Sequence, residues 1–144
     1  MIGGDDPLVI DASVAIKWYV PEEDDTRARA ILASGRQLLA PDLILAEVGN
    51  ILWKKVRRGT LTREDAEEIA ERFLRKAGIT VVSSTVLLLR ALQIANAHGP
   101  TVYDAQYVAL AVQDNLVAVT ADERLVRSLA GTPLAAHVRL LSTF

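Results

Sequence analysis

The chain has 144 residues, 51% of them hydrophobic and 24% charged, and its 16 basic and 18 acidic residues give a net charge of -2. This composition fits one globular domain over residues 1–144 and excludes a disordered chain. There is no cysteine, which excludes disulfides, thiolate zinc sites and cysteine nucleophiles. The longest apolar run, Tyr107–Val112, is too short to span a bilayer, and the first seven residues lack a secretory signal. We therefore expect a cytoplasmic protein without membrane contact.

Short apolar runs alternate with longer segments of helical periodicity along the chain. In the first part, strands are expected at Leu8–Ile10 and Leu38–Ala40. Helices are expected at Ser13–Val20, Glu22–Ala33 and Asp42–Arg58. The third of these helices has the clearest apolar stripe, formed by Ile44, Val48, Ile51 and Leu52.

The alternation continues to the end of the chain. A helix is expected to begin at Thr62 and to end at Gly78. The elements expected after it are strand Ile79–Ser83, helix Ser84–His98, helix Val102–Gln113, strand Leu116–Thr120, helix Asp122–Ala130 and strand Val138–Leu141. Strands separated by helices predict an α/β fold, with a parallel sheet covered on both faces.

Four acidic residues occupy positions where such a sheet carries its sites. Asp11 and Asp122 follow expected strands, Asp104 lies in the first turn of a helix, and Glu47 lies within the Asp42–Arg58 helix. Each also has a purely structural interpretation, as a helix-start residue or as a solvent-facing one. If the four meet in one crevice, their repulsion requires a cation, and oxygen ligands favour Mg²⁺ or Mn²⁺ over Zn²⁺.

Four segments of the chain resemble the PIN domain family, and most of all the VapC-like toxin ribonucleases of type II toxin–antitoxin modules. They are V-I-D-A-S-V-A-I-K-W at 9–18, A-P-D-L-I-L-A-E-V-G-N at 40–50, Y-D-A-Q-Y-V-A-L-A at 103–111 and V-T-A-D-E-R-L at 119–125. The resemblance implies a three-layer α/β/α PIN-like fold around a parallel sheet of about five strands. It also implies a Mg²⁺- or Mn²⁺-dependent endoribonuclease with a cognate antitoxin, usually as a homodimer.

The resemblance places the family's catalytic and metal-binding carboxylates on Asp11, Glu47, Asp104 and Asp122. We expect the three aspartates to hold the metal directly or through water. Glu47 is expected to complete the site and to orient or deprotonate the attacking water. Ser13 and Thr120 fall on the family's hydroxyl positions, and we expect them to hydrogen-bond to the ligands or to metal-bound water.

RNA binding also requires positive charge. Asn50, Lys54 and Arg57 follow Glu47 at helical spacing on roughly one face, and we expect them to contact backbone phosphates. The other interpretation is a solubilising helix end whose cations favour the helix dipole. Lys17, near Asp11, is a weaker candidate for the same task.

Competing functions fit the sequence less well. A receiver domain needs a phosphoacceptor Asp after its third strand and a Lys after its last, and the expected strands here end in Ser83-Ser84 and Ser142-Thr143-Phe144. A haloacid dehalogenase-type phosphatase needs a second Asp where Ser13 stands. A non-catalytic RNA-binding or protein-interaction module of the same fold stays open as the alternative function.

Overall fold

Five parallel strands form one sheet in the computed structural model, which describes residues 4–144. In the order β3-β2-β1-β4-β5, they are β3 (Ile79–Val82), β2 (Leu38–Pro41), β1 (Leu8–Ile10), β4 (Val117–Thr120) and β5 (Val138–Leu140). The predicted α/β fold with a five-stranded parallel sheet is confirmed. The first three residues of the expected domain, and of the segment examined for a secretory signal, lie outside the described part.

The strand order reverses at β1. The chain moves outward from β1 to β2 and β3, and then returns to place β4 on the other side of β1. In register, Leu8 lies opposite both Leu38 and Val117. In open α/β sheets, ligands bind outside the carboxyl ends of the strands at this kind of reversal. The fold therefore marks the carboxyl ends of β1 and β4 as the place for a site.

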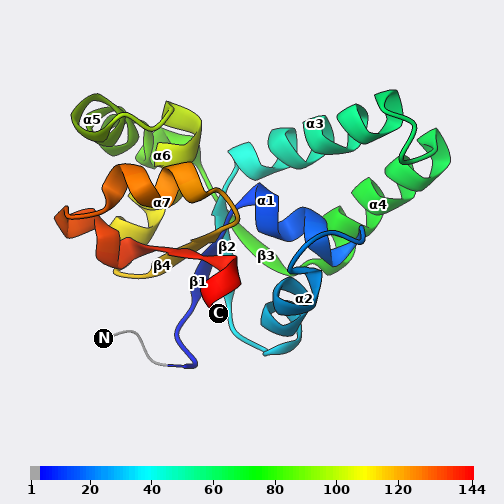
Figure 1. The fold of residues 1–144 in the computed structure, drawn as a ribbon, viewed down its shortest axis with the longest axis horizontal. Coiled ribbons are helices and arrows are strands. Elements are labelled where there is room, and N and C mark those ends of the chain that lie inside the picture. Colours follow the sequence, from blue (N-terminus) through cyan, green and yellow to red (C-terminus); the bar gives the residue numbers. More distant parts are fainter. Residues whose placement is uncertain (1–3) are drawn as a thin grey trace.

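Helices cover both faces of the sheet, which gives three layers (Figure 1). One layer holds α1 (Ala12–Ala15), α2 (Asp25–Ala33), α3 (Leu43–Arg57) and α4 (Arg63–Lys76). The other holds α5 (Leu88–His98), α6 (Val102–Gln113) and α7 (Glu123–Leu129). Because parallel crossovers are right-handed, the change of direction after β3 moves the later helices to the opposite face.

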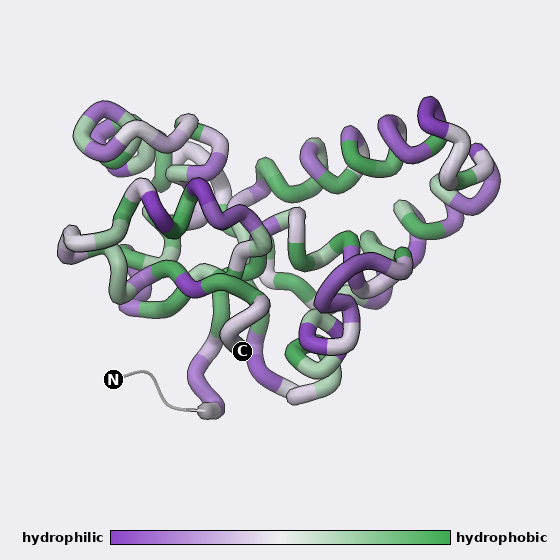
Figure 2. The backbone as a smooth tube through the Cα atoms, viewed as in Figure 1, coloured by the Kyte–Doolittle hydropathy of each residue, from purple (hydrophilic) through white to green (hydrophobic). Residues whose placement is uncertain are grey.

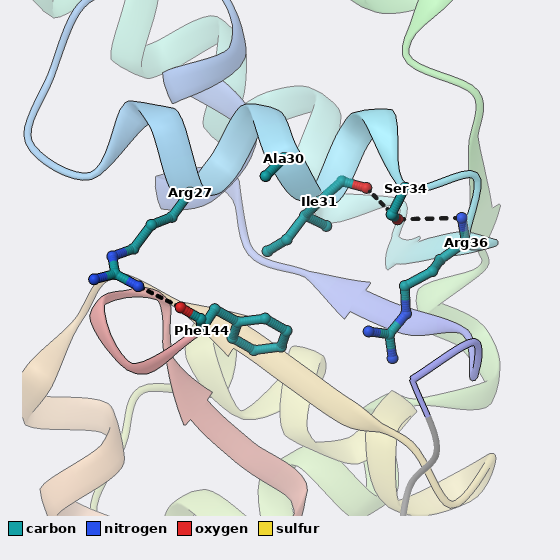
Figure 3. A pocket seen from close by; sticks show the side chains of 6 residues that line it. All are labelled: Arg27, Ala30, Ile31, Ser34, Arg36 and Phe144. Carbon is teal, nitrogen blue, oxygen red and sulfur yellow. Dashed lines mark hydrogen bonds between the residues drawn. The ribbon is translucent and has the colours of Figure 1, made fainter.

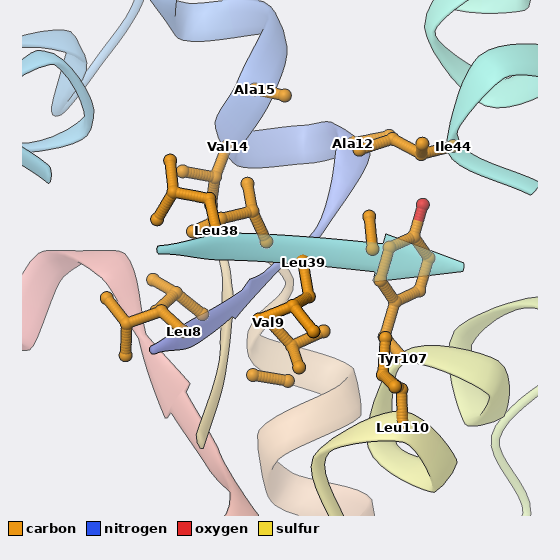
Figure 4. Packing of buried hydrophobic residues seen from close by; sticks show 14 of the residues in the cluster. Leu8, Val9, Ala12, Val14, Ala15, Leu38, Leu39, Ile44, Tyr107 and Leu110 are labelled. Atoms are coloured by element: carbon orange, nitrogen blue, oxygen red, sulfur yellow. The ribbon is translucent and has the colours of Figure 1, made fainter. Parts of the chain in front are cut away.

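The central strands are apolar because both of their faces are covered. Every residue of β1 and β2 is buried, whereas Val81 on the edge strand β3 is 44% exposed. Figure 4 shows Val14 and Ala15 of α1 on one side of β2 and Leu110 of α6 on the other. Hydropathy is high along these strands and alternates along α3 and α4, the pattern of amphipathic helices (Figure 2).

Local signals fix the turn from α5 to α6. Gly99 ends α5 in the left-handed conformation, with φ 92°, which glycine adopts without a Cβ clash. Thr101 then caps α6, because its Oγ1 accepts a hydrogen bond from the backbone N–H of Asp104 at 3.2 Å. The predicted helix stop and the next helix start are both confirmed, and together they set the place of Asp104.

The structure corrects several predicted element boundaries. The helix expected at Ser13–Val20 is α1 followed by a 3₁₀ turn, η1 (Ile16–Trp18). The helix expected at Ser84–His98 is split in the same way, because Ser83 caps a 3₁₀ turn, η2 (Ser84–Val86), before α5 begins. Two further 3₁₀ turns were not expected, η3 (Pro133–His137) and η4 (Leu141–Thr143). The remaining helices and strands differ from the predictions by a few terminal residues, where helix ends fray.

The C-terminal turn closes against α2. A hollow of about 250 Å³ lies between them, and Figure 3 shows Arg27 at one end, donating a hydrogen bond to the backbone oxygen of Phe144. None of the four predicted carboxylates lines this hollow. Within residues 4–144, no helix combines the length and apolarity needed to cross a membrane.

Candidate active site

Asp11 is the most buried of the four predicted carboxylates. It follows β1 directly, and its backbone N–H donates to the carbonyl of Val119 at 3.1 Å, which ties the end of β1 to β4. The Asp11 side chain is the acceptor for two hydroxyl groups, Thr120 Oγ1 at 2.7 Å and Ser13 Oγ at 3.0 Å, both at Oδ2. Burial raises the pKa of Asp11, and these hydrogen bonds offset part of that rise.

The same two hydroxyls connect Asp11 to the loop after β4. Ser13 Oγ accepts from the N–H of Ala121 at 3.1 Å, and Thr120 Oγ1 accepts from the N–H of Asp122 at 3.0 Å. Thr120 is fully buried, so its hydroxyl acts entirely within the protein. The structure therefore brings Ser13, Thr120 and Asp122 together with Asp11, as the sequence predicted.

Asp122 has the structural role that the sequence also allowed. It is the N-cap of α7, and its Oδ1 accepts from the backbone N–H of Arg124 at 2.9 Å. Capping uses one carboxylate oxygen and fixes the side chain at the carboxyl end of β4. The structural and functional interpretations of Asp122 are therefore compatible.

Asp104 reaches the same region from the first turn of α6. Its pKa is raised to about 6, first by burial and then by the negative charges of Asp11 and Asp122, while Arg124 acts in the opposite direction. This electrostatic effect requires the three carboxylates to lie near one another. Asp11 after β1, Asp122 after β4 and Asp104 on α6 therefore lie near one another.

Glu47 completes the cluster from α3. Its pKa is raised by burial and by the charges of Asp11 and Asp104, whereas a hydrogen bond from Tyr107 lowers it. Tyr107 donates from its hydroxyl to Glu47 Oε1 at 2.6 Å and is fully buried. Figure 4 shows the Tyr107 ring passing the carboxyl end of β2, with its hydroxyl pointing toward α3, where Ile44 lies. The interpretation of Glu47 as an ordinary solvent-facing residue is therefore wrong.

The donor set fits a hard divalent cation. All four side chains offer oxygen atoms. Burial, together with their mutual repulsion, raises the pKa values of Glu47 and Asp104, and a cation would offset this cost of the ionised forms. Among residues 4–144, no three acidic or histidine side chains already stand at metal-binding distances. Side-chain movement is needed to close the four around an ion.

Comparison with known proteins decides the family. The sequence profile of the PIN domain matches residues 8–129, which includes all four carboxylates. The chain belongs to the PIN domain family. The resemblance predicted from the sequence is confirmed.

This PIN domain is similar to a named ribonuclease and to solved structures of the same fold. Ribonuclease VapC3 of Pyrobaculum aerophilum is 40% identical over 120 residues, which cover 82% of this chain and 91% of the relative. The crystal structure of PAE2754 from the same organism superposes with a TM-score of 0.70 at 25% identity, over 96% of this chain and 86% of that one. VapBC2 from Rickettsia felis, bound to a DNA fragment from its promoter, has a TM-score of 0.62 at 13% identity, over 93% and 98% of the two chains.

The basic residues of the PIN domain are placed in two ways. Asn50, Lys54 and Arg57 are exposed on α3, with the Arg57 guanidinium 5.3 Å from the Trp53 ring centre. Lys17 is only 8% exposed and is ion-paired to Glu22 at 3.2 Å. The prediction that Lys17 contacts RNA phosphates is therefore contradicted, because its side chain is buried and its ammonium group already donates to Glu22 and to the backbone carbonyl of Glu23.

Two features of the site were not predicted. The hydrogen bond from Tyr107 to Glu47 joins residues 60 positions apart, which no local pattern reveals. Arg124 was not singled out at all, although it stands two residues after Asp122 and its charge acts on Asp104. Its spacing from a predicted ligand was the only signal available in the sequence.

Proposed function

We propose that this PIN domain is a metal-dependent endoribonuclease and the toxin of a toxin–antitoxin pair. The observation that supports this most is the meeting of Asp11, Glu47, Asp104 and Asp122 at the reversal of strand order. Similarity to a ribonuclease, VapC3, adds the reaction class. Cleavage of RNA phosphodiester bonds is the activity that fits both the carboxylate cluster and the similarity to VapC3.

The carboxylates would hold Mg²⁺ or Mn²⁺. A bound divalent cation of this kind activates water and stabilises charge on a phosphate. We assign its binding to Asp11, Asp104 and Asp122, with Ser13 and Thr120 holding Asp11 in place through their hydrogen bonds to Oδ2.

Glu47 would orient the attacking water and accept its proton. Tyr107 occupies Oε1, which leaves Oε2 as the oxygen that takes the proton. The raised pKa of Glu47 suits this role, because a carboxylate becomes a better base as its pKa approaches the working pH.

The substrate strand would extend along α3. Asn50, Lys54 and Arg57 are exposed and share the face that carries Glu47. Ten positions of helix separate Glu47 from Arg57, about 15 Å at a rise of about 1.5 Å per residue. We assign these side chains to phosphates that flank the scissile bond.

The partners follow from the same proposal. An antitoxin arginine among four carboxylates would be electrostatically well matched and would block the site. A solved structure of the same fold, from Klebsiella pneumoniae, is a toxin–antitoxin complex. We also propose that the protein forms a homodimer. The exposed apolar surface of α5, formed by Leu88, Leu89 and Leu92, would supply its interface.

The test is cleavage of total cellular RNA by purified, antitoxin-free protein in Mg²⁺, Mn²⁺ or EDTA. We expect discrete fragments that require metal and that disappear in Asp11→Asn and Asp104→Asn variants with unchanged circular dichroism. Full cleavage by folded Asp11→Asn would overturn the assignment. Absence of cleavage by the folded wild type in either metal would favour the non-catalytic binding module.

A further inference from the structure

A pocket of about 350 Å³ adjoins the carboxylates, between the turn from α5 to α6 and helix α7. Asp104 and Asp122 form part of its wall, and its other polar lining is His98, Thr101, Arg124 and Ser128. We propose that this pocket binds the RNA nucleotide next to the scissile phosphate, with the Arg124 guanidinium contacting that nucleotide's phosphate. The inference rests on the proposed ribonuclease function and adds a substrate subsite to it.

Arg124 is held at the edge of the acidic cluster. Its backbone N–H is fixed by the Asp122 cap at 2.9 Å, and its side chain is close enough to lower the pKa of Asp104. Nevertheless, within residues 4–144 no carboxylate oxygen lies within 4.0 Å of its guanidinium, whereas Lys17 and Lys55 both pair with Glu22. Arg124 thus keeps its donors for a ligand, and a planar guanidinium is well suited to a phosphate.

The charge of the cluster explains why such a cation is needed. Four ionised carboxylates with one divalent cation among them still carry about two negative charges, which repel an approaching phosphodiester. An arginine beside the cluster offsets that repulsion without occupying a ligand position. Arg124 meets this condition, because it lines the same pocket as Asp104 and Asp122.

The position of the pocket complements the basic face of α3. α7 lies on one face of the sheet and α3 on the other, with the carboxyl ends of the strands between them (Figure 1). RNA that crosses these strand ends therefore meets Asn50, Lys54 and Arg57 on one side and Arg124 on the other. The carboxylates lie between the two sets of contacts, where the scissile bond must be.

The pocket has the size and lining for one unstacked nucleotide. Its volume lies near the lower end of the range of about 300–1,000 Å³ that is usual for small-ligand pockets. Pro100 and Leu125 supply apolar wall, and the side chains of His98 and Thr101 supply polar groups. Proteins that recognise RNA by sequence mostly bind unpaired, splayed bases in this way.

The experiment measures RNA binding without cleavage. Labelled ten-nucleotide homopolymers of A, C, G and U are titrated by fluorescence anisotropy in EDTA at several salt concentrations. The variants are Arg124→Ala, Arg124→Lys and Ser128→Phe, which fills the pocket and leaves the arginine in place. Arg127→Ala is the matched control, because Arg127 is exposed on α7 but does not line the pocket.

We expect Arg124→Ala to weaken binding about tenfold and to reduce the salt slope by about 0.7, the value for one phosphate contact on a single strand. Arg124→Lys should retain the salt slope and lose part of the affinity, since it keeps the charge without the planar fork. Ser128→Phe should weaken binding with the slope unchanged. Arg127→Ala should bind like the wild type.

Two results would overturn the subsite. One is wild-type affinity in both Arg124→Ala and Ser128→Phe, and the other is an equal loss in Arg124→Ala and Arg127→Ala. Cleavage of total RNA, measured in parallel, separates this inference from the proposed function. Cleavage by the wild type, with unaltered binding by both Arg124→Ala and Ser128→Phe, refutes the subsite alone. Selective loss of binding in Arg124→Ala with no cleavage by the wild type refutes the ribonuclease and supports the pocket.

Discussion

Replacing Asp104 with Asn should stabilise the metal-free protein at neutral and higher pH. The pKa of Asp104 rises from the ordinary 3.8 to about 6, so the folded state binds its proton more tightly than the unfolded state. Ionised Asp104 therefore destabilises the fold. This cost is complete above pH 6 and disappears as the pH falls from about 6 to below 4.

The magnitude follows from the pKa. A rise from 3.8 to about 6 corresponds to about 3 kcal/mol at 1.36 kcal/mol per pKa unit. Asp104 is partly exposed, and solvent screening should reduce the cost to about 1–2 kcal/mol. For a chain of this size, we expect the melting temperature of Asp104→Asn to be about 3–6 °C higher than that of the wild type at pH 8 in EDTA.

The assay is thermal and urea unfolding of both proteins between pH 4 and pH 8. Asp114→Asn serves as the control, because it removes one negative charge from the end of the same helix, outside the cluster. Mg²⁺ at pH 8 should stabilise the wild type and have a smaller effect on Asp104→Asn, since metal bound to the native state adds to stability. If Asp104→Asn is no more stable at pH 8 than at pH 4.5, relative to wild type, then burial and the neighbouring carboxylates do not raise the pKa of Asp104 as argued.

Two further predictions concern catalysis and RNA binding. Tyr107→Phe removes a hydrogen bond to a charged group, worth about 1.5–3 kcal/mol, and should slow metal-dependent cleavage about 10- to 100-fold while circular dichroism is unchanged. It should also shift the acidic limb of the pH–rate profile to higher pH. The hydrogen bond from Tyr107 lowers the pKa of Glu47, so its loss raises that pKa. An unshifted profile at full rate would mean that Tyr107 is only a core residue. Reversing charge in Lys54→Glu/Arg57→Glu should reduce the salt slope of single-stranded RNA binding by about 1.4, at about 0.7 for each phosphate contact. The same slope in this variant and in a Lys76→Glu control on α4 would contradict the phosphate contacts on α3.

The positions of the acidic side chains were predictable because they depend on chain-order rules. Asp11 and Asp122 follow apolar strands, and parallel strands deliver such residues to one edge of a sheet. The end of one helix at His98 and the start of the next at Val102 depend on local signals, and both are confirmed. Glu47 was selected for its position within the Asp42–Arg58 helix, and the family resemblance then placed a catalytic carboxylate on it.

The unpredicted features depend on contacts between distant segments. The prediction for Lys17 failed because its side chain is buried within a 3₁₀ turn and its ammonium group is bound by Glu22, five residues later. Lys55 reaches the same Glu22 from α3 at 2.6 Å, a pairing that needs the tertiary fold. The role of Tyr107 likewise requires α6 and α3 to approach across the end of β2. Composition and periodicity carry no information about such approaches.

The strand order has a consequence for the timing of activity during synthesis. Asp11, Glu47 and Asp104 are all present in a nascent chain that ends before β4, but the strand that fixes Asp11 through Thr120 is still missing. Chains are made from the amino terminus at about 5–20 residues per second, so Asp11 waits several seconds for the strand that holds it. The carboxylate cluster can therefore take its final geometry only after β4 has joined the sheet beside β1.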